Sequence, residues 1–417
     1  MTMNTSVKST ALEPGRGASF WNKLTSNYGM VLLTIGLFVL FAALRPDTFA
    51  SLLNFQLLAS SKAVLLILAI AVTIPMVTGK IDLSIGYGVG LWQVMALSWQ
   101  IEGLDYRLVI VLVIVGGGVI GLLNALLVEL AQVDAFIATL ATGQVIFAVT
   151  YWYTGGRQVT DSDGARAVAF DELSRWSLGP IPGPFVIAIV LALVVWIVLD
   201  YFPVGRYLYA VGANPAAATL TGIARRKYVV GAMVASGMLT GVAGILLASR
   251  QAGVAQANIG PEYLLPALAA AFLGSTTIRP GRVNGLGTIL GVTIATIGIS
   301  GLQQLFPGQF YLEPLFNGLT LVAAITIASL ATRRRTTRAD AAPLTDGSTT
   351  SGTGSPGTGS PGTGSPGTGS PGTGSPGTGS PGTGSPGTGS PGTVPETSDV
   401  TPSESTTRTT TARKDIS

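Results

Sequence analysis

Long apolar stretches recur along most of this sequence, and they restrict it to folds that a lipid bilayer can hold. A spanning helix needs about 20 mostly apolar residues. Only 11% of the residues are charged, against roughly 25% in soluble globular chains. The pattern predicts an all-α, polytopic transmembrane bundle with short or broken third and eighth helices. The ten expected spans are 28–44, 55–78, 83–99, 108–130, 135–154, 184–203, 228–250, 261–276, 285–305 and 311–331.

The distribution of basic residues predicts the orientation of these spans. An even number of spans puts both termini on one side of the membrane. Basic residues gather before the first span and after the last one: Lys8, Arg16, Lys23, Arg333, Arg334, Arg335 and Arg338. The positive-inside rule then places both termini in the cytoplasm of a multi-pass cell-membrane protein. The loop with Glu129 and Asp134 fits poorly, because it is expected inside and carries no basic residue.

The two ends of the chain differ in composition from the apolar part. Residues 1–27 form a polar N-terminal segment, and 28–331 form the expected membrane domain. Residues 352–391 are eight copies of Gly-Thr-Gly-Ser-Pro, and such a segment has no apolar side chains to offset its ordering entropy. We expect 332–417 to be a disordered cytoplasmic tail. It is either a tether for a partner or, as we favour, a tolerated low-complexity extension.

Several classes of chemistry are excluded by missing residue types. The chain has no cysteine and no histidine, which excludes disulfides, Cys/His metal sites and His-dependent triads. It also lacks a phosphate-binding loop with the Gly-Lys-Ser/Thr ending. We therefore expect no enzyme activity, no cofactor, no metal site and no nucleic-acid partner. The acidic residues of the membrane part lie at span ends, which argues against an ion-coupled transporter. That alternative stays open because backbone carbonyls at broken helices can bind sodium.

The first interruption of interest lies between the second and third spans. Gly79 permits a tight reversal, and Asp82, shortly before Ser84, can cap the next helix by accepting backbone N–H bonds. Gly86, with two more glycines at positions 88 and 90, would let another helix approach closely. A capped helix hairpin explains these residues; the alternative is a helix break beside a transport pathway.

The second interruption is the expected cytoplasmic loop 212–223. Asn214 suits an N-cap and the proline after it suits the first helical turn. Ala217 and Ala218 belong to a run of three alanines, and Gly222 can end the short helix. A helix with so little side-chain bulk can seat in a cleft of a cytoplasmic partner, or it can simply connect two spans.

Several segments, in order, resemble the permease subunits of ribose- and xylose-type ATP-binding-cassette importers. The family's Gly-Ile-Asp-Leu-Ser-Val-Gly-like stretch is matched by 80–86, its Asn-Ala-Leu-Leu-Val by 124–128, and its Phe-Ile-Ala-Thr-Leu by 136–140. Its cytoplasmic motif Gly-x-Asn-x-x-Ala-Ala-x-x-x-Gly-Ile matches 212–223. The sequence departs from the family pattern at Lys80 and around 274–287, which leaves the substrate open.

The resemblance implies the rest of a transport machine. Two permease subunits, identical or closely related, would form the pathway. Two cytoplasmic ATPase subunits would grip the coupling helix at Gly212, Asn214, Ala217, Ala218 and Gly222, and an extracytoplasmic sugar-binding protein would dock outside. Arg225 and Lys227 would support ATPase contact or, more simply, membrane orientation.

The expected cargo is a monosaccharide resembling a pentose. The alternatives are a branched-chain amino acid, a nucleoside or a furanosyl signal in the same architecture, an ion-coupled transporter, and a passive channel.

Overall fold

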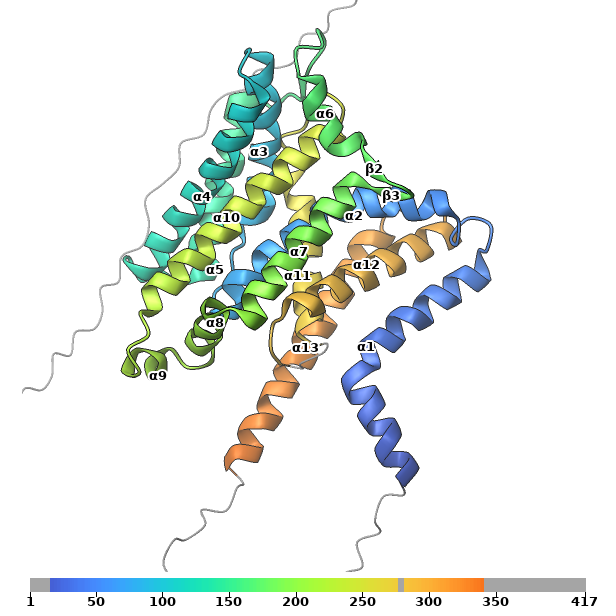
Figure 1. The fold of residues 1–417 in the computed structure, drawn as a ribbon, viewed down its shortest axis with the longest axis vertical. Coiled ribbons are helices and arrows are strands. Elements are labelled where there is room, and N and C mark those ends of the chain that lie inside the picture. Colours follow the sequence, from blue (N-terminus) through green and yellow to red (C-terminus); the bar gives the residue numbers. More distant parts are fainter. Residues whose placement is uncertain (1–15, 277–280, 341–417) are drawn as a thin grey trace, which may run out of the picture. The chain divides into compact units, whose positions relative to one another are not determined.

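The computed structural model describes residues 16–276 and 281–340, and its long helices run alternately up and down (Figure 1). The helices are α1 (Arg16–Leu44), α2 (Leu52–Val77), α3 (Ser84–Ile101), α4 (Tyr106–Glu129), α5 (Ala135–Thr154), α6 (Val168–Arg175), α7 (Gly183–Tyr201), α8 (Pro203–Ala213), α9 (Pro215–Leu220), α10 (Arg225–Arg250), α11 (Gly260–Ser275), α12 (Gly285–Leu305) and α13 (Leu312–Asp340). Two short antiparallel pairs join β1 (Val159–Thr160) to β4 (Val254–Ala255) and β2 (Ser177–Leu178) to β3 (Ile181–Pro182).

The predicted all-α membrane fold is confirmed. Each of the ten expected spans corresponds to one long helix, namely α1–α5, α7 and α10–α13. Among the described residues, six of these helices are long and apolar enough to cross a membrane by themselves. The apolar parts of α1 and α13 are shorter, at Gly29–Leu44 and Leu312–Ile327, and α3 and α11 are short as expected. The exact number of spans therefore stays a prediction.

The structure differs from the sequence-based expectation at several boundaries. Helix α1 begins before position 28, and α13 continues past the expected end at 331. The predicted tail is thus helical as far as Asp340, and the repeats at 352–391 lie outside the described residues. The sequence analysis also missed α6 and α8. Helix α7 ends before α8 because Phe202 has an extended backbone, as a residue preceding proline tends to have.

Helix α2 forms the centre of the bundle. Its residues from Ala63 to Val77 are buried without interruption, and α7, α10, α11 and α12 all pack against it. A helix that is apolar on all sides is expected in such a buried position. Helices α4, α5 and α7, in contrast, expose large apolar side chains such as Val111, Ile137 and Val190, as lipid-facing helices do.

A close helix crossing joins α4 to α10. Gly117 and Gly121 on α4 face Gly237 and Gly241 on α10, so each helix carries a Gly-x-x-x-Gly pair. A Cβ atom added at Gly117 would lie 2.2 Å from the carbonyl oxygen of Gly237. Only glycine permits this approach, which is typical of helix pairs in membranes.

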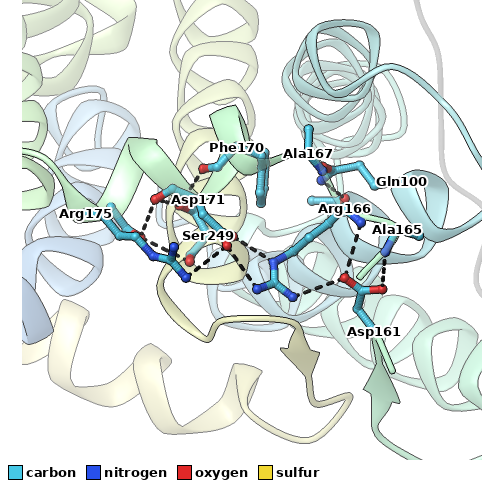
Figure 2. Close-up of polar contacts among 11 residues, drawn as sticks. Gln100, Asp161, Ala165, Arg166, Ala167, Phe170, Asp171, Arg175 and Ser249 are labelled. Carbon is cyan, nitrogen blue, oxygen red and sulfur yellow. Dashed lines mark hydrogen bonds and ion pairs between the residues drawn. The ribbon is translucent and has the colours of Figure 1, made fainter. Parts of the chain in front are cut away.

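An ordered cap covers the end of the bundle that is expected to face outward. Figure 2 shows that Arg166 donates to Asp171 from both Nε and Nη2, at 2.8 and 2.9 Å, and to Asp161 from Nη1 at 3.1 Å. Arg175 also pairs with Asp171 at 3.1 Å. Ser249, near the end of α10, donates to the carbonyl oxygen of Phe170 at 2.8 Å. The Ser249 bond fixes the loop before α7 onto α10, and the Ala167 amide donates to Oε1 of Gln100 on α3 at 3.4 Å.

The same cap alters the acidity of Asp161. Burial acts to raise the pKa of this carboxyl, but the Ala165 and Arg166 amides and the Arg166 guanidinium favour its charged form more strongly. The net result is a pKa below the ordinary value of 3.8. The ionised carboxylate therefore stabilises the cap at neutral pH.

Candidate functional site

A sharp break separates α2 from α3. Gly79 has a φ of +78°, a left-handed conformation that glycine adopts without strain, as the sequence predicted. The Thr78 hydroxyl donates to the Pro75 carbonyl at 2.8 Å, and the Lys80 amide donates to the same oxygen at 3.1 Å. The chain thus reverses in a compact turn within the bundle.

Asp82 is the centre of a buried polar cluster at this break. Its side chain is buried, and its Oδ1 accepts hydrogen bonds from the Ser84 amide at 3.0 Å and the Ser84 hydroxyl at 2.6 Å. Its Oδ2 accepts from the Ser236 hydroxyl of α10 at 2.9 Å. Asn124 of α4 donates to the Ser84 hydroxyl at 2.8 Å. The carboxylate therefore receives the expected amide bond at the start of α3, and it also ties α3 to α10.

Thr139 of α5 completes the hydrogen bonding of the irregular backbone. Its hydroxyl accepts from the Leu83 amide at 2.9 Å, and it lies 3.2 Å from the Ile81 carbonyl oxygen and 2.8 Å from that of Ala135, to which it can donate. Non-helical backbone inside a membrane is tolerated only where protein or water satisfies its polar groups. Four helices thus supply the polar groups that permit a break at this position.

The glycines that follow the break bring α3 close to two other helices. A Cβ atom added at Gly86 would lie 2.6 Å from Cβ of Leu264 on α11, and one at Gly88 would lie 2.9 Å from Cγ2 of Thr240 on α10. The predicted close approach is confirmed. On these faces α3 therefore has almost no spare volume between its backbone and the neighbouring helices.

The loop between α7 and α10 forms two short helices, α8 and α9. Asn214 caps α9, since its Oδ1 accepts from the Ala217 amide at 3.0 Å. Gly222 follows α9 with a φ of +82°. The predicted start and end of this helix are therefore confirmed, and Figure 1 places α8 and α9 at the end of the bundle opposite α6.

The two alanines of α9 that were expected to contact a partner differ in exposure. Ala217 is exposed, whereas Ala218 is buried against Val211 and Val229. Ala218 therefore seats α9 on the bundle in this structure and presents no side chain to a partner. The last residue of α9, Leu220, has 89% of its surface exposed. Sequence analysis missed Leu220, although a single leucine at the end of a short alanine-rich helix, between two threonines, can indicate an exposed contact residue.

Gly212 links this loop to the α2–α3 break. A Cβ atom added at Gly212 would lie 2.0 Å from the Val77 carbonyl oxygen, and one at Gly79 would lie 3.9 Å from the Gly212 oxygen. The end of α8 thus touches the end of α2 backbone to backbone. At this contact the backbone of Gly212 lies directly against the backbone of Val77 and Thr78.

Arg225 at the start of α10 explains the acidic loop that fitted the orientation poorly. Its Nη2 lies 2.9 Å from Oε2 of Glu129, whose side chain is buried at the end of α4. Arg225, the first residue of α10, therefore supplies the positive charge expected beside the loop that follows α4. Arg225 has a structural partner within the chain, whereas Lys227 is exposed.

The polar partners of Asp82 were also missed by sequence analysis. Asn124, Thr139 and Ser236 are fully buried in helices that are otherwise mostly apolar, and a polar residue in an apolar span is itself a signal of a buried contact. The described residues contain no group of three or more acidic, histidine or cysteine side chains that could hold a metal ion.

The family match and the similar proteins all name permease components of transport systems. The family described as "Branched-chain amino acid transport system / permease component" matches residues 54–330. The ribose import permease protein of Haemophilus influenzae is 32% identical over 291 residues, which are 69% of this chain and 88% of that protein. That of Bacillus subtilis is 32% identical over 295 residues, 70% and 90% of the two chains.

A second group of relatives is named for another sugar. The galactose/methyl galactoside import permease protein of Haemophilus influenzae is 28% identical over 326 residues, 74% of this chain and 94% of that protein. No solved structure gives a significant match.

Proposed function

We propose, from the premise that this chain belongs to the family of branched-chain amino acid transport system permease components, that it is the membrane subunit of an ATP-driven monosaccharide importer. The observation that carries the proposal is the contact between the exposed α9 and the α2–α3 break through Gly212. A cytoplasmic partner that binds α9 would thus be connected, through α8, to helices inside the membrane. The chain binds no nucleotide by a phosphate loop, so a separate ATPase supplies the energy.

Coupling begins at the exposed surface of α9. Ala217 and Leu220 present a small face and an apolar anchor, which suit insertion into a groove of a folded partner. Asn214 and Gly222 fix the two ends of the helix. When the ATPase subunits close on ATP, α9 and α8 move together and push on Val77 at the end of α2. The α2–α3 break then shifts the helices around the pathway.

The names of the relatives favour a sugar as the cargo over an amino acid. The curated relatives described above are import permeases for ribose and galactose. An ion-coupled mechanism has less support, because the buried carboxylate of Asp82 already accepts three hydrogen bonds from serines. A second permease subunit and an extracytoplasmic sugar-binding protein complete the proposed assembly, with both termini of the chain in the cytoplasm.

The proposal is tested by purifying the chain in mild detergent from cells that carry its own ATPase. We expect an ATPase subunit to co-purify, and D-ribose or D-galactose with its binding protein to stimulate ATP hydrolysis. L-leucine should have no effect. Stimulation by L-leucine alone, or a chain that never retains an ATPase, would contradict the proposal.

Two matched variants test the role of α9. Leu220→Asp places a charge on the exposed anchor and should abolish co-purification of the ATPase. Leu130→Asp makes the same change at another exposed leucine, at the end of α4, and should not. Equal ATPase content in both variants would show that α9 is not the contact.

A further inference from the structure

A pocket lies at the opposite end of the bundle from α9. Its volume is about 570 Å³, and residues of α2, α11 and α13 line it together with the end of α10. Ligand pockets of small molecules span about 300–1,000 Å³, so its size suits a small solute. Under the proposed orientation, the pocket faces the outside of the cell.

The lining carries an unusual concentration of charge for a membrane bundle. Lys62 follows the first residue of α2 by ten positions, which is about 15 Å along the helix. Its Nζ lies 3.0 Å from Oε1 of Glu313 on α13. Arg250 and Glu262 add one charge of each sign. Lys62 lies within a membrane helix, where an ionisable group is costly and marks a functional site by default, whereas Arg250, Glu262 and Glu313 lie at helix ends.

The balance of these charges points to a neutral solute. Two cations and two carboxylates line the pocket, so its formal charge sums to zero. Lys62 and Glu313 already neutralise each other. The pocket therefore offers both donors and acceptors without a net field that would select an anion or a cation.

Aromatic and amide side chains complete the lining. Tyr263 is partly buried in the wall, while Phe310 is 92% exposed. Asn317 is 5% exposed, and its Oδ1 has no hydrogen-bond partner among the described residues. A buried polar atom without a partner calls for an explanation, such as a missing ligand or water. Ring faces beside donors and acceptors match a sugar, which has apolar C–H faces and a rim of hydroxyls.

We infer that this pocket is the outer vestibule that receives the monosaccharide. Lys62 and Glu313 exchange hydrogen bonds with its hydroxyls, and Tyr263 and Phe310 offer apolar ring faces. The inference rests on the proposed import function and adds the place where the solute enters this chain.

The absence of cysteine from the sequence permits a direct test by thiol labelling. Leu265→Cys places one thiol in the pocket at a side chain that is 54% exposed. A membrane-impermeant thiol reagent is added outside intact cells that express the whole transporter. We expect saturating D-ribose or D-galactose to slow labelling by about threefold or more, because a bound solute shields most of its pocket.

Val168→Cys is the matched control. It lies on α6 in the outer cap and is 72% exposed, so it should be labelled at the same rate with and without sugar. Protection of Leu265→Cys by L-leucine and by neither sugar would overturn the inference.

A second variant measures the contribution of the ion pair. Glu313→Gln should raise the KM of sugar uptake by about tenfold, equivalent to about 1.4 kcal/mol, while ATPase co-purification is unchanged. Glu102→Gln makes the same change at an exposed carboxylate outside the pocket and should leave KM unaltered. One combination of results overturns the vestibule but not the import function. In it, the chain imports either sugar, sugar does not slow the labelling of Leu265→Cys, and Glu313→Gln leaves the KM of uptake unchanged. If the unmodified chain imports neither sugar, the proposed function fails and the vestibule fails with it.

Discussion

Replacing Asp82 by alanine removes the acceptor of three hydrogen bonds at the α2–α3 break. The Ser84 amide, the Ser84 hydroxyl and the Ser236 hydroxyl all donate to this carboxylate in a buried environment. A buried donor left without an acceptor costs about 1–3 kcal/mol. The hydroxyls can rotate toward other acceptors, whereas the amide cannot. We therefore expect Asp82→Ala to lower the free energy of unfolding by about 2–5 kcal/mol.

Two further variants separate the hydrogen bonds from the volume of the side chain. Asp82→Asn keeps the shape and one acceptor, so it should cost less than Asp82→Ala. Ser236→Ala removes only the bond from α10. In the Asp82→Ala background, Ser236→Ala should have almost no further effect, which gives a coupling energy of about 1–2 kcal/mol between the two residues.

Tryptophan fluorescence during a titration with sodium dodecyl sulfate measures this series, since the chain has six tryptophans. The unmodified chain, the three single variants and the double variant are compared in one detergent at one pH. Equal midpoints for Asp82→Ala and the unmodified chain would refute the assignment of Asp82 as the organiser of the break. Strict additivity of the two substitutions would refute the bond to Ser236.

Three more outcomes follow from particular contacts. Gly237→Ala should destabilise the chain by about 1–3 kcal/mol in the same titration, because its Cβ would lie 2.1 Å from a carbonyl oxygen of α4. At the control position, Gly318→Ala, the added Cβ meets nothing within 4 Å and should not destabilise the chain. Arg225→Ala leaves the buried carboxylate of Glu129 without its partner and should lower the free energy of unfolding by about 1–3 kcal/mol. This is less than the loss expected for a fully buried ion pair, because the Arg225 side chain is 37% exposed. Arg225→Lys should recover part of the loss. The pKa of Asp161 is lowered in the folded cap, so its contribution to stability is complete above pH 3.8 and is lost as the pH falls through the folded-state pKa. The protection factors of the 161–175 amides, which compare their hydrogen exchange with the intrinsic rate at each pH, should fall there. In Asp161→Asn the same protection factors should be lower at neutral pH.

The sequence predicted the long helices well because each is set by local composition. The apolar length of a segment such as 108–130 suffices to place α4 within a few residues. The capping residues Asn214 and Gly222 likewise act on their own backbone, so the ends of α9 could be predicted. The basic residues at the two ends gave an orientation, and the pairing of Arg225 with Glu129 supplies a basic partner for the acidic loop that starts there.

Contacts between distant segments could not be predicted in this way. The burial of Ala218 and the exposure of Leu220 depend on how α9 rests on α10, not on the residues of α9 alone. The link between Lys62 and Glu313 joins positions 251 residues apart in the sequence, and no local pattern pairs them. Helix α8 was missed because Pro203 starts a new helix directly after α7, where the long apolar stretch ends.

The most direct test of ATP-driven monosaccharide import is the accumulation of labelled D-ribose and D-galactose by cells that express this chain with its ATPase and binding protein. Cells without their own ribose and galactose transporters are treated either to deplete ATP or with an uncoupler while ATP is maintained. We predict that depletion of ATP abolishes accumulation and that the uncoupler does not. Accumulation that survives ATP depletion and collapses with the uncoupler would contradict the account.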